Sequence, residues 1–211
     1  RLLKTYVSTD AQGLNRVAYA SFKREAHGEL KAYIGRLEST DVVKLNRKEQ
    51  FAFWANLYNA KTIDIVLDKY PVASIKDISL GGSLIASVKG GPWTAKVVKV
   101  AGRDLSLDDI EHGIMRRIFK DPRVHYAVNC ASVGCPNLKA EAFVGDRLEQ
   151  QLELVILDRA AEARLDLERL VETFLHGRFE QAEGRPAGGL GVVQGHVGML
   201  EQPVHVGAVL R

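Results

Sequence analysis

The chain has 211 residues, of which 46% are hydrophobic and 26% are charged, and its formal net charge is +3. This length suits one domain with a sizeable core. Basic and acidic residues are interspersed, and no apolar run approaches the ~18 residues of a membrane span, so we expect neither nucleic-acid binding nor a transmembrane segment. The chain begins with Arg1 instead of methionine, which indicates a processed product from which an export signal would already be gone.

Two helices are predicted in the first third of the chain. Between residues 14 and 37, apolar side chains recur every three or four positions, the pattern of an amphipathic helix. A second helix is expected from 46 to 69, because Asn46 and Glu49 have the spacing of a capping box. This helix is apolar almost all round, which is typical of a helix in the middle of a fold.

Polar and aromatic side chains interrupt this pattern and form a candidate binding set. Asn56 and Asn59 share one face of the second helix, and buried amides must be hydrogen-bonded. They either bond the backbone of a neighbouring loop or line a polar cleft. Tyr58 and Trp93 are assigned to the core or to the wall of such a cleft. Trp93 follows a Gly-Gly-Pro sequence, so it could instead cover a substrate as a lid.

The middle of the chain alternates between turns and short elements. The glycine-rich residues 81–92 predict a surface loop without a phosphate-binding motif. An alternating strand is predicted at 96–100, followed by a short helix from Ser106 to about Phe119. Residues 124–130 also alternate, and we expect this second strand beside the first in one small sheet.

Both cysteines lie just after this predicted strand, in a loop marked by Gly134 and Pro136. Three interpretations stay open. Cys130 is a nucleophile presented at the strand end, or Cys130 and Cys135 form a disulfide or redox pair, or both simply pack. In the catalytic interpretation, Cys135 borders the substrate.

A thiol nucleophile needs a base and groups that orient it. The predicted base is His112, with Glu111 beside it, because a short helix can bring it to Cys130 from another element. His125 and Asn129 share a face of the predicted strand, whereas Cys130 points to the other, so a direct His125–Cys130 pair requires a bulge. Asn59 or Asn129 is expected to give polar support.

A metal site is the weaker alternative for these side chains. Cys130, Cys135, His112 and His125 are of ligand type, but their spacing is not that of a zinc site. We therefore expect no metal and no cofactor. The remaining histidines, His27 among them, are expected to be solvated.

Three blocks of sequence are similar, in order, to one family. The blocks are Phe-Trp-Ala-Asn-Leu-Tyr-Asn-Ala at 53–60, Gly-Pro-Trp at 91–93 leading to Leu-Ser-Leu-Asp-Asp-Ile-Glu-His-Gly at 105–113, and residues 121–136 around the cysteines. They resemble the domain of unknown function 547 family over roughly residues 1–150. The resemblance implies a compact α+β domain and an arrangement similar to cysteine peptidases or transglutaminases. Because bacterial members often carry export signals, it also implies a periplasmic or exported location.

The C-terminal part departs from the family pattern. A long helix is predicted at 146–178, docked by a stripe of Leu148, Leu152, Ile156 and Ala160. Family members usually continue with strands that carry a Tyr and a Trp-Phe pair, and this chain has neither. Either the lineage diverged, or residues from about 154 onward are a shifted reading frame or the replacement of a truncated end.

We therefore predict a helix-rich α+β domain over 1–180, with a central buried helix and a small, mainly antiparallel sheet. Residues 181–211 are expected to be a poorly ordered glycine-rich tail. The predicted function is a cysteine-dependent hydrolase or acyl transferase acting on a small molecule or peptide. The alternative is a non-catalytic binding or structural module of the cell envelope, in which Cys130 and Cys135 are structural or disulfide-bonded.

Overall fold

The computed structural model describes residues 1–80, 91–132 and 134–158, together with residues 160, 164 and 168. The loop predicted at 81–92 is therefore described only at 91–92. The tail predicted at 181–211 and most of the distal half of the helix predicted at 146–178 lie outside the described residues.

A short hairpin connects the first two helices. Helix α1 (Leu2–Tyr6) leads into strands β1 (Val7–Thr9) and β2 (Asn15–Val17), which pair antiparallel. Helix α2 (Tyr19–Glu38) follows. The rings of Tyr6 and Phe22 stack with their centroids 4.4 Å apart, so α1 is held against α2 by aromatic packing.

The predicted central helix is confirmed as α3 (Arg47–Lys69), of whose 23 residues 15 are buried. Its capping box is also confirmed. The Asn46 side chain accepts hydrogen bonds from the backbone N–H groups of Lys48 and Glu49, and Glu49 accepts one from the Asn46 N–H. These bonds satisfy donors that a helix start would otherwise leave unpaired.

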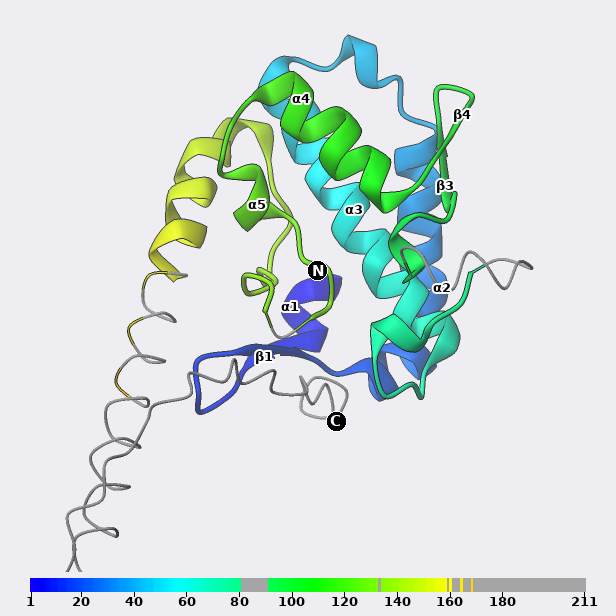
Figure 1. The fold of residues 1–211 in the computed structure, drawn as a ribbon, viewed down its shortest axis with the longest axis vertical. Helices are drawn as coiled ribbons and strands as arrows, with labels where there is room; N and C mark the ends of the chain where they lie inside the picture. The colour runs from blue at the N-terminus through cyan, green and yellow to red at the C-terminus, as the bar shows by residue number, and fades with distance from the viewer. Residues whose placement is uncertain (81–90, 133, 159, 161–163, 165–167, 169–211) are drawn as a thin grey trace, which may run out of the picture.

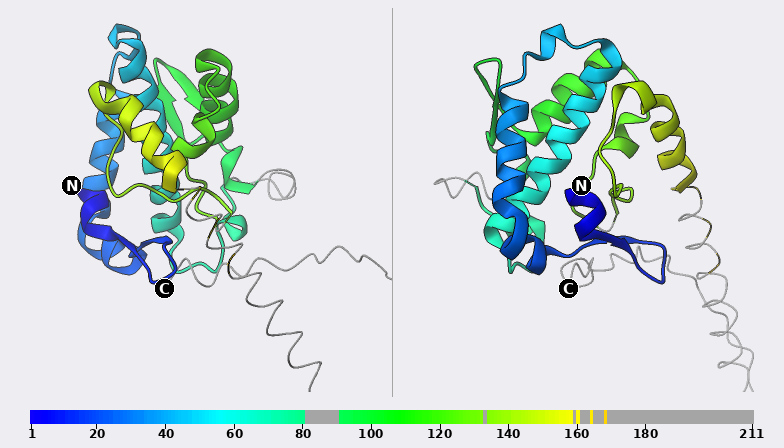
Figure 2. Two further views of the ribbon diagram at one scale, coloured as in Figure 1. Left: turned by 90° about the vertical axis from the view of Figure 1, so that its left-hand side faces the viewer. Right: turned by 180° about the vertical axis from the view of Figure 1, so that it is seen from behind.

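Helix α3 has neighbours on several sides (Figures 1 and 2). Seen from the side in Figure 2, α2 lies on one side of α3, and the helix that contains α4 lies on the opposite side. The segment around η5 (Gly145–Arg147) contacts α3 near its start. A Cβ at Gly145 would lie 2.8 Å from Cγ of Glu49, so this close approach requires glycine.

The strand predicted at 96–100 is present from 98 to 100, and it forms a hairpin that the sequence analysis did not predict. Strands β3 (Val98–Val100) and β4 (Arg103–Leu105) pair antiparallel. The two residues between them, Ala101 and Gly102, have φ values of 50° and 76°. Positive φ at both positions is the requirement of a tight type I′ turn.

The prediction of a strand at 124–130 is wrong. The chain forms a one-turn helix, α5 (Val124–Ala127), and no strand pairs with β3 in this segment. The Asp121 side chain accepts a hydrogen bond from the Arg123 backbone N–H at 2.9 Å, which starts a turn. Val124, Ala127 and Val128 are buried, a spacing that a helical turn satisfies as well as a strand.

The helix predicted from Ser106 contains a wider turn. Ser106 and Asp109 bond each other's backbone N–H groups, as in a capping box. The helix then forms the π-helix η4 (Asp109–Met115) and the final turn α4 (Arg116–Phe119). A π-turn inside a helix is often found at a functional site.

The remaining described elements are short. They are the 3₁₀ turns η1 (Val42–Lys44), η2 (Ile75–Asp77) and η3 (Gly91–Trp93), and a helix at 148–158. On the 148–158 helix, Leu148, Leu152 and Val155 are buried, whereas Ile156 is 38% exposed and Ala160 is also exposed. The predicted stripe is therefore right in its first half and wrong at Ile156 and Ala160, because Val155 takes the inner position.

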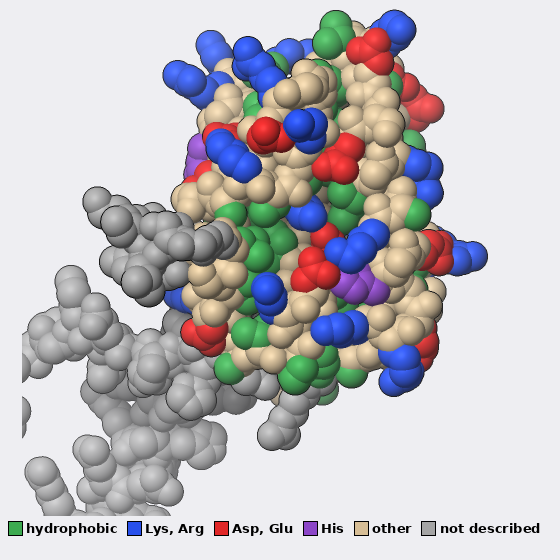
Figure 3. All heavy atoms as spheres, turned by 90° about the vertical axis from the view of Figure 1, so that its right-hand side faces the viewer, with side chains coloured by type: hydrophobic (Ala, Val, Ile, Leu, Met, Phe, Trp, Pro, Cys, Tyr) green, Lys and Arg blue, Asp and Glu red, His purple; other side chains and the backbone are tan. Residues whose placement is uncertain are grey.

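The described residues form an α+β domain with two small antiparallel sheets, so the predicted fold class is confirmed. The single sheet expected to contain 96–100 and 124–130 is replaced by two separate hairpins. Lysine and arginine side chains are mixed with aspartate and glutamate on the face shown in Figure 3. Among the described helices, none has both the length and the apolar character needed to cross a membrane.

Candidate functional site: a disulfide loop held by asparagines

The two cysteines are bonded to each other. The Cys130–Cys135 disulfide joins residues whose Cα atoms are 6.2 Å apart, and both side chains are partly exposed. The Cys135 N–H donates to the Ser132 carbonyl at 2.9 Å. Of the three interpretations of these cysteines, the structure has the disulfide, and neither cysteine is a free thiol.

Asn59 fixes the backbone where the chain enters this loop. Its amide donates to the Ala127 carbonyl at 2.9 Å and accepts from the Asn129 N–H at 2.8 Å. Asn59 is 7% exposed, so the Ala127 carbonyl is satisfied in a buried position and the Asn129 N–H in a partly buried one. The Asn129 side chain then accepts from Ala131 N–H and donates to the Pro136 carbonyl, which closes the loop across the disulfide.

Asn56 fixes the backbone where the chain leaves the loop region. Its amide donates to the Phe143 carbonyl and accepts from the Phe143 N–H, both at 2.9 Å. Buried Gln151 continues this arrangement, because it accepts from the Val144 N–H and donates to the Ala142 carbonyl. The interpretation that Asn56 and Asn59 bond a neighbouring loop is therefore confirmed.

Two further asparagines attach the loop to the N-terminal hairpin. Asn137 accepts from the Asn15 N–H and donates to the Gly13 carbonyl, each at 2.9 Å. Asn15 in turn donates to the Leu138 carbonyl. Segments more than 120 residues apart are thus joined by side-chain amides, a pairing that the sequence analysis missed because neither residue interrupts a predicted element.

The predicted base His112 is exposed on η4, and its side chain makes no hydrogen bond or ion pair with any residue that the structure describes. Its neighbour Glu111 instead pairs with Arg116 at 2.8 Å, across the five-residue spacing of a π-turn. Arg116 Nη2 also lies 3.4 Å from Nδ1 of His125, which is exposed. Two predicted site residues, Glu111 and His125, are thus linked through Arg116.

Tyr58 belongs to this second group. Its side chain is 2% exposed, and its hydroxyl lies near enough to the Glu111 carboxylate to interact with it. Burial, followed by the charge of Glu111, raises the pKa of Tyr58 above its ordinary value. No described contact joins this Tyr58–Glu111–Arg116–His125 chain to Cys130.

Trp93 lies against the backbone in η3. A Cβ at Gly91 would be 2.9 Å from the Trp93 ring, so the close approach of the ring requires glycine. Gly91 also has a φ of +58°, a backbone conformation that favours glycine. The Trp93 ring is partly buried, and its Nε1 has no hydrogen-bond partner among the described residues. Its role as a lid stays a prediction.

A cavity of about 230 Å³ lies between α1, α2, α3 and residues 138–142. Asn56 and Asn59 are part of its wall, whereas Tyr58 and Trp93 are not among its lining residues. A smaller cavity of about 40 Å³ borders Cys135 and Asn129. Two of the predicted binding residues thus meet at the larger cavity, and Cys135 lies at the smaller one.

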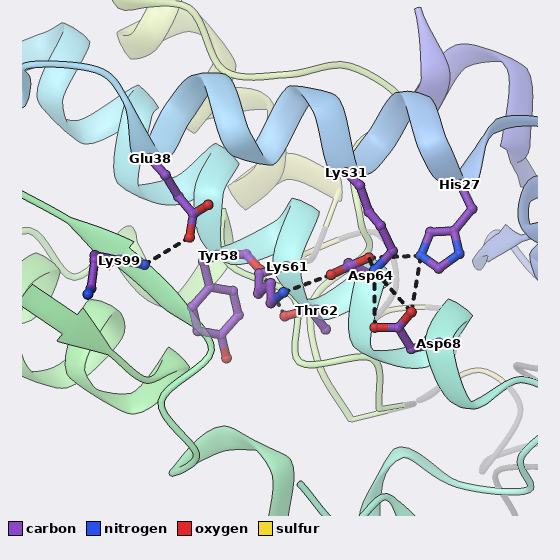
Figure 4. A network of polar contacts seen from close by, with 9 residues as sticks. All are labelled: His27, Lys31, Glu38, Tyr58, Lys61, Thr62, Asp64, Asp68 and Lys99. Carbon is purple, nitrogen blue, oxygen red and sulfur yellow. Dashed lines mark hydrogen bonds and ion pairs between the residues drawn. The ribbon is translucent and has the colours of Figure 1, made fainter.

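A charged cluster on α2 and α3 was also missed (Figure 4). The Asp64 carboxylate, 1% exposed, lies 2.8 Å from His27 Nε2, 2.9 Å from Lys31 Nζ and 2.8 Å from Lys61 Nζ. Asp68, 46% exposed, pairs with Lys31 at 3.0 Å. The expectation that His27 is solvated is wrong, since its side chain is 14% exposed. The signal in the sequence was Asp64, the one charged residue within the otherwise apolar or neutral stretch 62–67 of the helix.

His27, Asp64 and Asp68 offer ligand atoms within 4.8 Å of one another. Two ammonium groups, those of Lys31 and Lys61, already occupy the oxygens of Asp64 and neutralise it. A cation would have to displace them, so the cluster is explained as an ion-pair network that joins α2 to α3.

Residues 42–157 match the sequence profile of the family described as protein of unknown function, DUF547. The match covers more than half of the 211 residues, so the chain belongs to this family. No curated protein matches the chain. No solved structure matches it either.

We expect replacement of Asn59 by alanine to destabilise the fold by about 2 to 4 kcal/mol, because it leaves a buried carbonyl and a partly buried N–H unpaired. Asn137→Ala removes an equivalent pair of bonds, to the Gly13 carbonyl and from the Asn15 N–H, in a less buried position and should cost about 1 kcal/mol. Urea denaturation of both variants measures the difference. Equal and small effects would show that Asn59 is not needed to hold the loop.

The Asp64 network predicts a loss of stability in acid. Burial alone would raise the pKa of Asp64, but hydrogen bonds from Lys61 and Lys31 outweigh it and lower the pKa. The ionised carboxylate therefore stabilises the fold at any pH above ~3.9, the pKa of an aspartate in the unfolded chain. This contribution is lost as the pH falls through the lowered pKa of the folded state.

Asp64→Asn should accordingly lose about 2 to 3 kcal/mol at pH 7 and depend less on pH below about 4. The matched control is Asp68→Asn, whose side chain is far more exposed. Urea denaturation between pH 2 and 7 tests this. A parallel acid dependence in Asp64→Asn and the unmodified protein would contradict the assignment.

Proposed function

We propose that this DUF547 domain is a non-catalytic binding module in which the Cys130–Cys135 disulfide is structural. The observation that carries the proposal is the bonded state of both cysteines within a loop fixed on each side by asparagine side chains. A residue whose sulfur is bonded and whose backbone is fixed in this way is suited to shaping a surface.

The loop continues directly into a cavity wall, which supports a binding role. Leu138, Lys139 and Ala142 follow Cys135 and line the cavity of about 230 Å³. Asn56 and Asn59 hold the same segment and border the same cavity. A change in the disulfide loop would therefore move the wall of the cavity.

The alternative is the cysteine hydrolase, with Cys130 as nucleophile and His112 as base. It requires reduction of the disulfide, since only a thiolate attacks a substrate. It also requires His112 or His125 to approach Cys130. His125 is bonded to Arg116, and His112 makes no described contact with the loop. These observations favour the binding module.

A structural disulfide also bears on location. Disulfides form and persist in oxidising compartments such as the bacterial periplasm and are rare in the cytosol. The Cys130–Cys135 bond therefore supports the proposal that the protein acts in the cell envelope.

The disulfide should be detectable as an absence of alkylation. Iodoacetamide should label neither cysteine of the native protein until a reductant is added. Replacement of both cysteines by serine should lower the free energy of unfolding by about 2 kcal/mol, the loop-entropy contribution of a short disulfide loop. It should also weaken binding of naphthalene, a neutral probe of suitable size, measured by its fluorescence.

Mass spectrometry of the alkylated protein and urea denaturation give the readouts. The exposed pair Ser8→Ala and Thr94→Ala provides a control with no disulfide change. Labelling of Cys130 in the native protein without reductant, at a pH below the pKa of ~8.5 of a free cysteine, would favour the hydrolase. Absence of naphthalene binding to the native protein would contradict a binding role for the cavity.

A further inference from the structure

The interior of the cavity of about 230 Å³ is apolar. Helices α1, α2 and α3 contribute Leu3, Phe22, Leu30 and Ile63, and the segment after the disulfide contributes Leu138. The two amides in the wall, Asn56 and Asn59, each already donate one hydrogen bond to the backbone and accept another. A ligand inside therefore gains most by burying apolar surface.

The volume limits the apolar part of such a ligand. An engineered apolar cavity of about 150 Å³ binds benzene, so proportional scaling gives room for roughly nine carbon atoms here. One fused bicyclic ring or a short alkyl chain fits this size.

The acidic side chains around the cavity have partners, whereas two of the basic ones are paired with no described carboxylate. Glu29 pairs with Arg1 at 2.6 Å, and Glu141 lies 3.6 Å from Arg147 and accepts from Gln151 at 3.1 Å. Both acidic groups that line the cavity are thus neutralised or hydrogen-bonded.

Two cations that line the same cavity have no such partner. Neither Arg36 on α2 nor Lys139 on the segment after the disulfide has a described carboxylate within 4.0 Å. The pKa of Glu141 is lowered by its hydrogen bond from Gln151 and, after that, by the charges of Arg147 and Lys139, so Lys139 acts on Glu141 only from a longer distance. The Arg36 guanidinium lies 5.8 Å from the centroid of the Tyr33 ring, a contact that leaves its N–H donors available. The cavity therefore combines an apolar interior with an excess of positive charge.

We propose that the cavity binds an amphipathic monocarboxylate whose apolar body fills the interior and whose carboxylate is held by Arg36 and Lys139. This inference rests on the binding role proposed above and specifies the chemical class of the ligand. Guanidinium and ammonium groups form charge-assisted hydrogen bonds with carboxylates, whereas they repel a cationic ligand of the same shape.

Three probes with the same ring separate the two proposals: 2-naphthoate, naphthalene and 2-(aminomethyl)naphthalene. Fluorescence titration of the full chain should give 2-naphthoate the lowest Kd and the aminomethyl compound the highest. Arg36→Gln and Lys139→Gln should each raise the Kd of 2-naphthoate about threefold to tenfold and leave the Kd of naphthalene unchanged. Lys44→Gln, which removes a lysine that does not line the cavity, should change neither.

Ala142→Trp provides a second test, because the Ala142 side chain is exposed and lines the cavity, so a larger side chain there should reduce the space without disrupting the core. It should weaken the binding of both 2-naphthoate and naphthalene. If naphthalene and 2-naphthoate bind equally and Arg36→Gln has no effect, the monocarboxylate assignment is wrong while the binding role stands. If none of the three probes binds, the binding role itself is wrong.

Discussion

The backbone of residues 127–129 and 142–144 sets the constraint on which the rest of the structure depends. These two stretches lie beside the apolar helix α3 without a strand partner, and backbone N–H and C=O groups that are shielded from water must be hydrogen-bonded. Asn56 and Asn59 on α3, together with Gln151, supply those bonds. Amides inside an otherwise apolar helix thereby take the place of a β-ladder.

This arrangement connects the disulfide, the cavity and the N-terminal hairpin. Asn59 holds the backbone before Cys130, Asn137 holds the backbone after Cys135, and Asn56 holds the segment that closes the cavity wall. Tyr58, the residue before Asn59 on α3, points from a different face of the helix and begins the Tyr58–Glu111–Arg116–His125 chain. Neighbouring positions on α3 thus serve two separate polar groups, of which only one contacts the disulfide loop.

Local signals were sufficient for much of the fold. The capping box at Asn46 and Glu49 and the apolar surface of α3 depend on nearby residues, and both predictions are confirmed. Alternation at 124–130 failed because Val124, Ala127 and Val128 also fit a helical turn, and the Asp121 turn decides between the two. The family was recognised from three sequence blocks, because their residues and their order can be read without knowing which residues are in contact.

Long-range contacts could not be predicted from the sequence. The Asn15–Asn137 pairing and the Asp64 network join elements that no spacing relates, so the binding of His27 to Asp64 was missed. The disulfide was one of three open interpretations, because a separation of five residues permits a bond without requiring it. The predicted base His112 has the right residue type, but no described contact brings it to Cys130.

Native-state amide hydrogen exchange tests the central claim most directly. If asparagine side chains hold the loop as part of the core, the amides of Asn129, Phe143 and Val144 should exchange only through near-global unfolding. In Asn59→Ala, the Asn129 amide should lose this protection while the amide of Val66 in α3 retains it. Exchange of Asn129 and Phe143 at the rate of exposed loops in the unmodified protein would contradict the account.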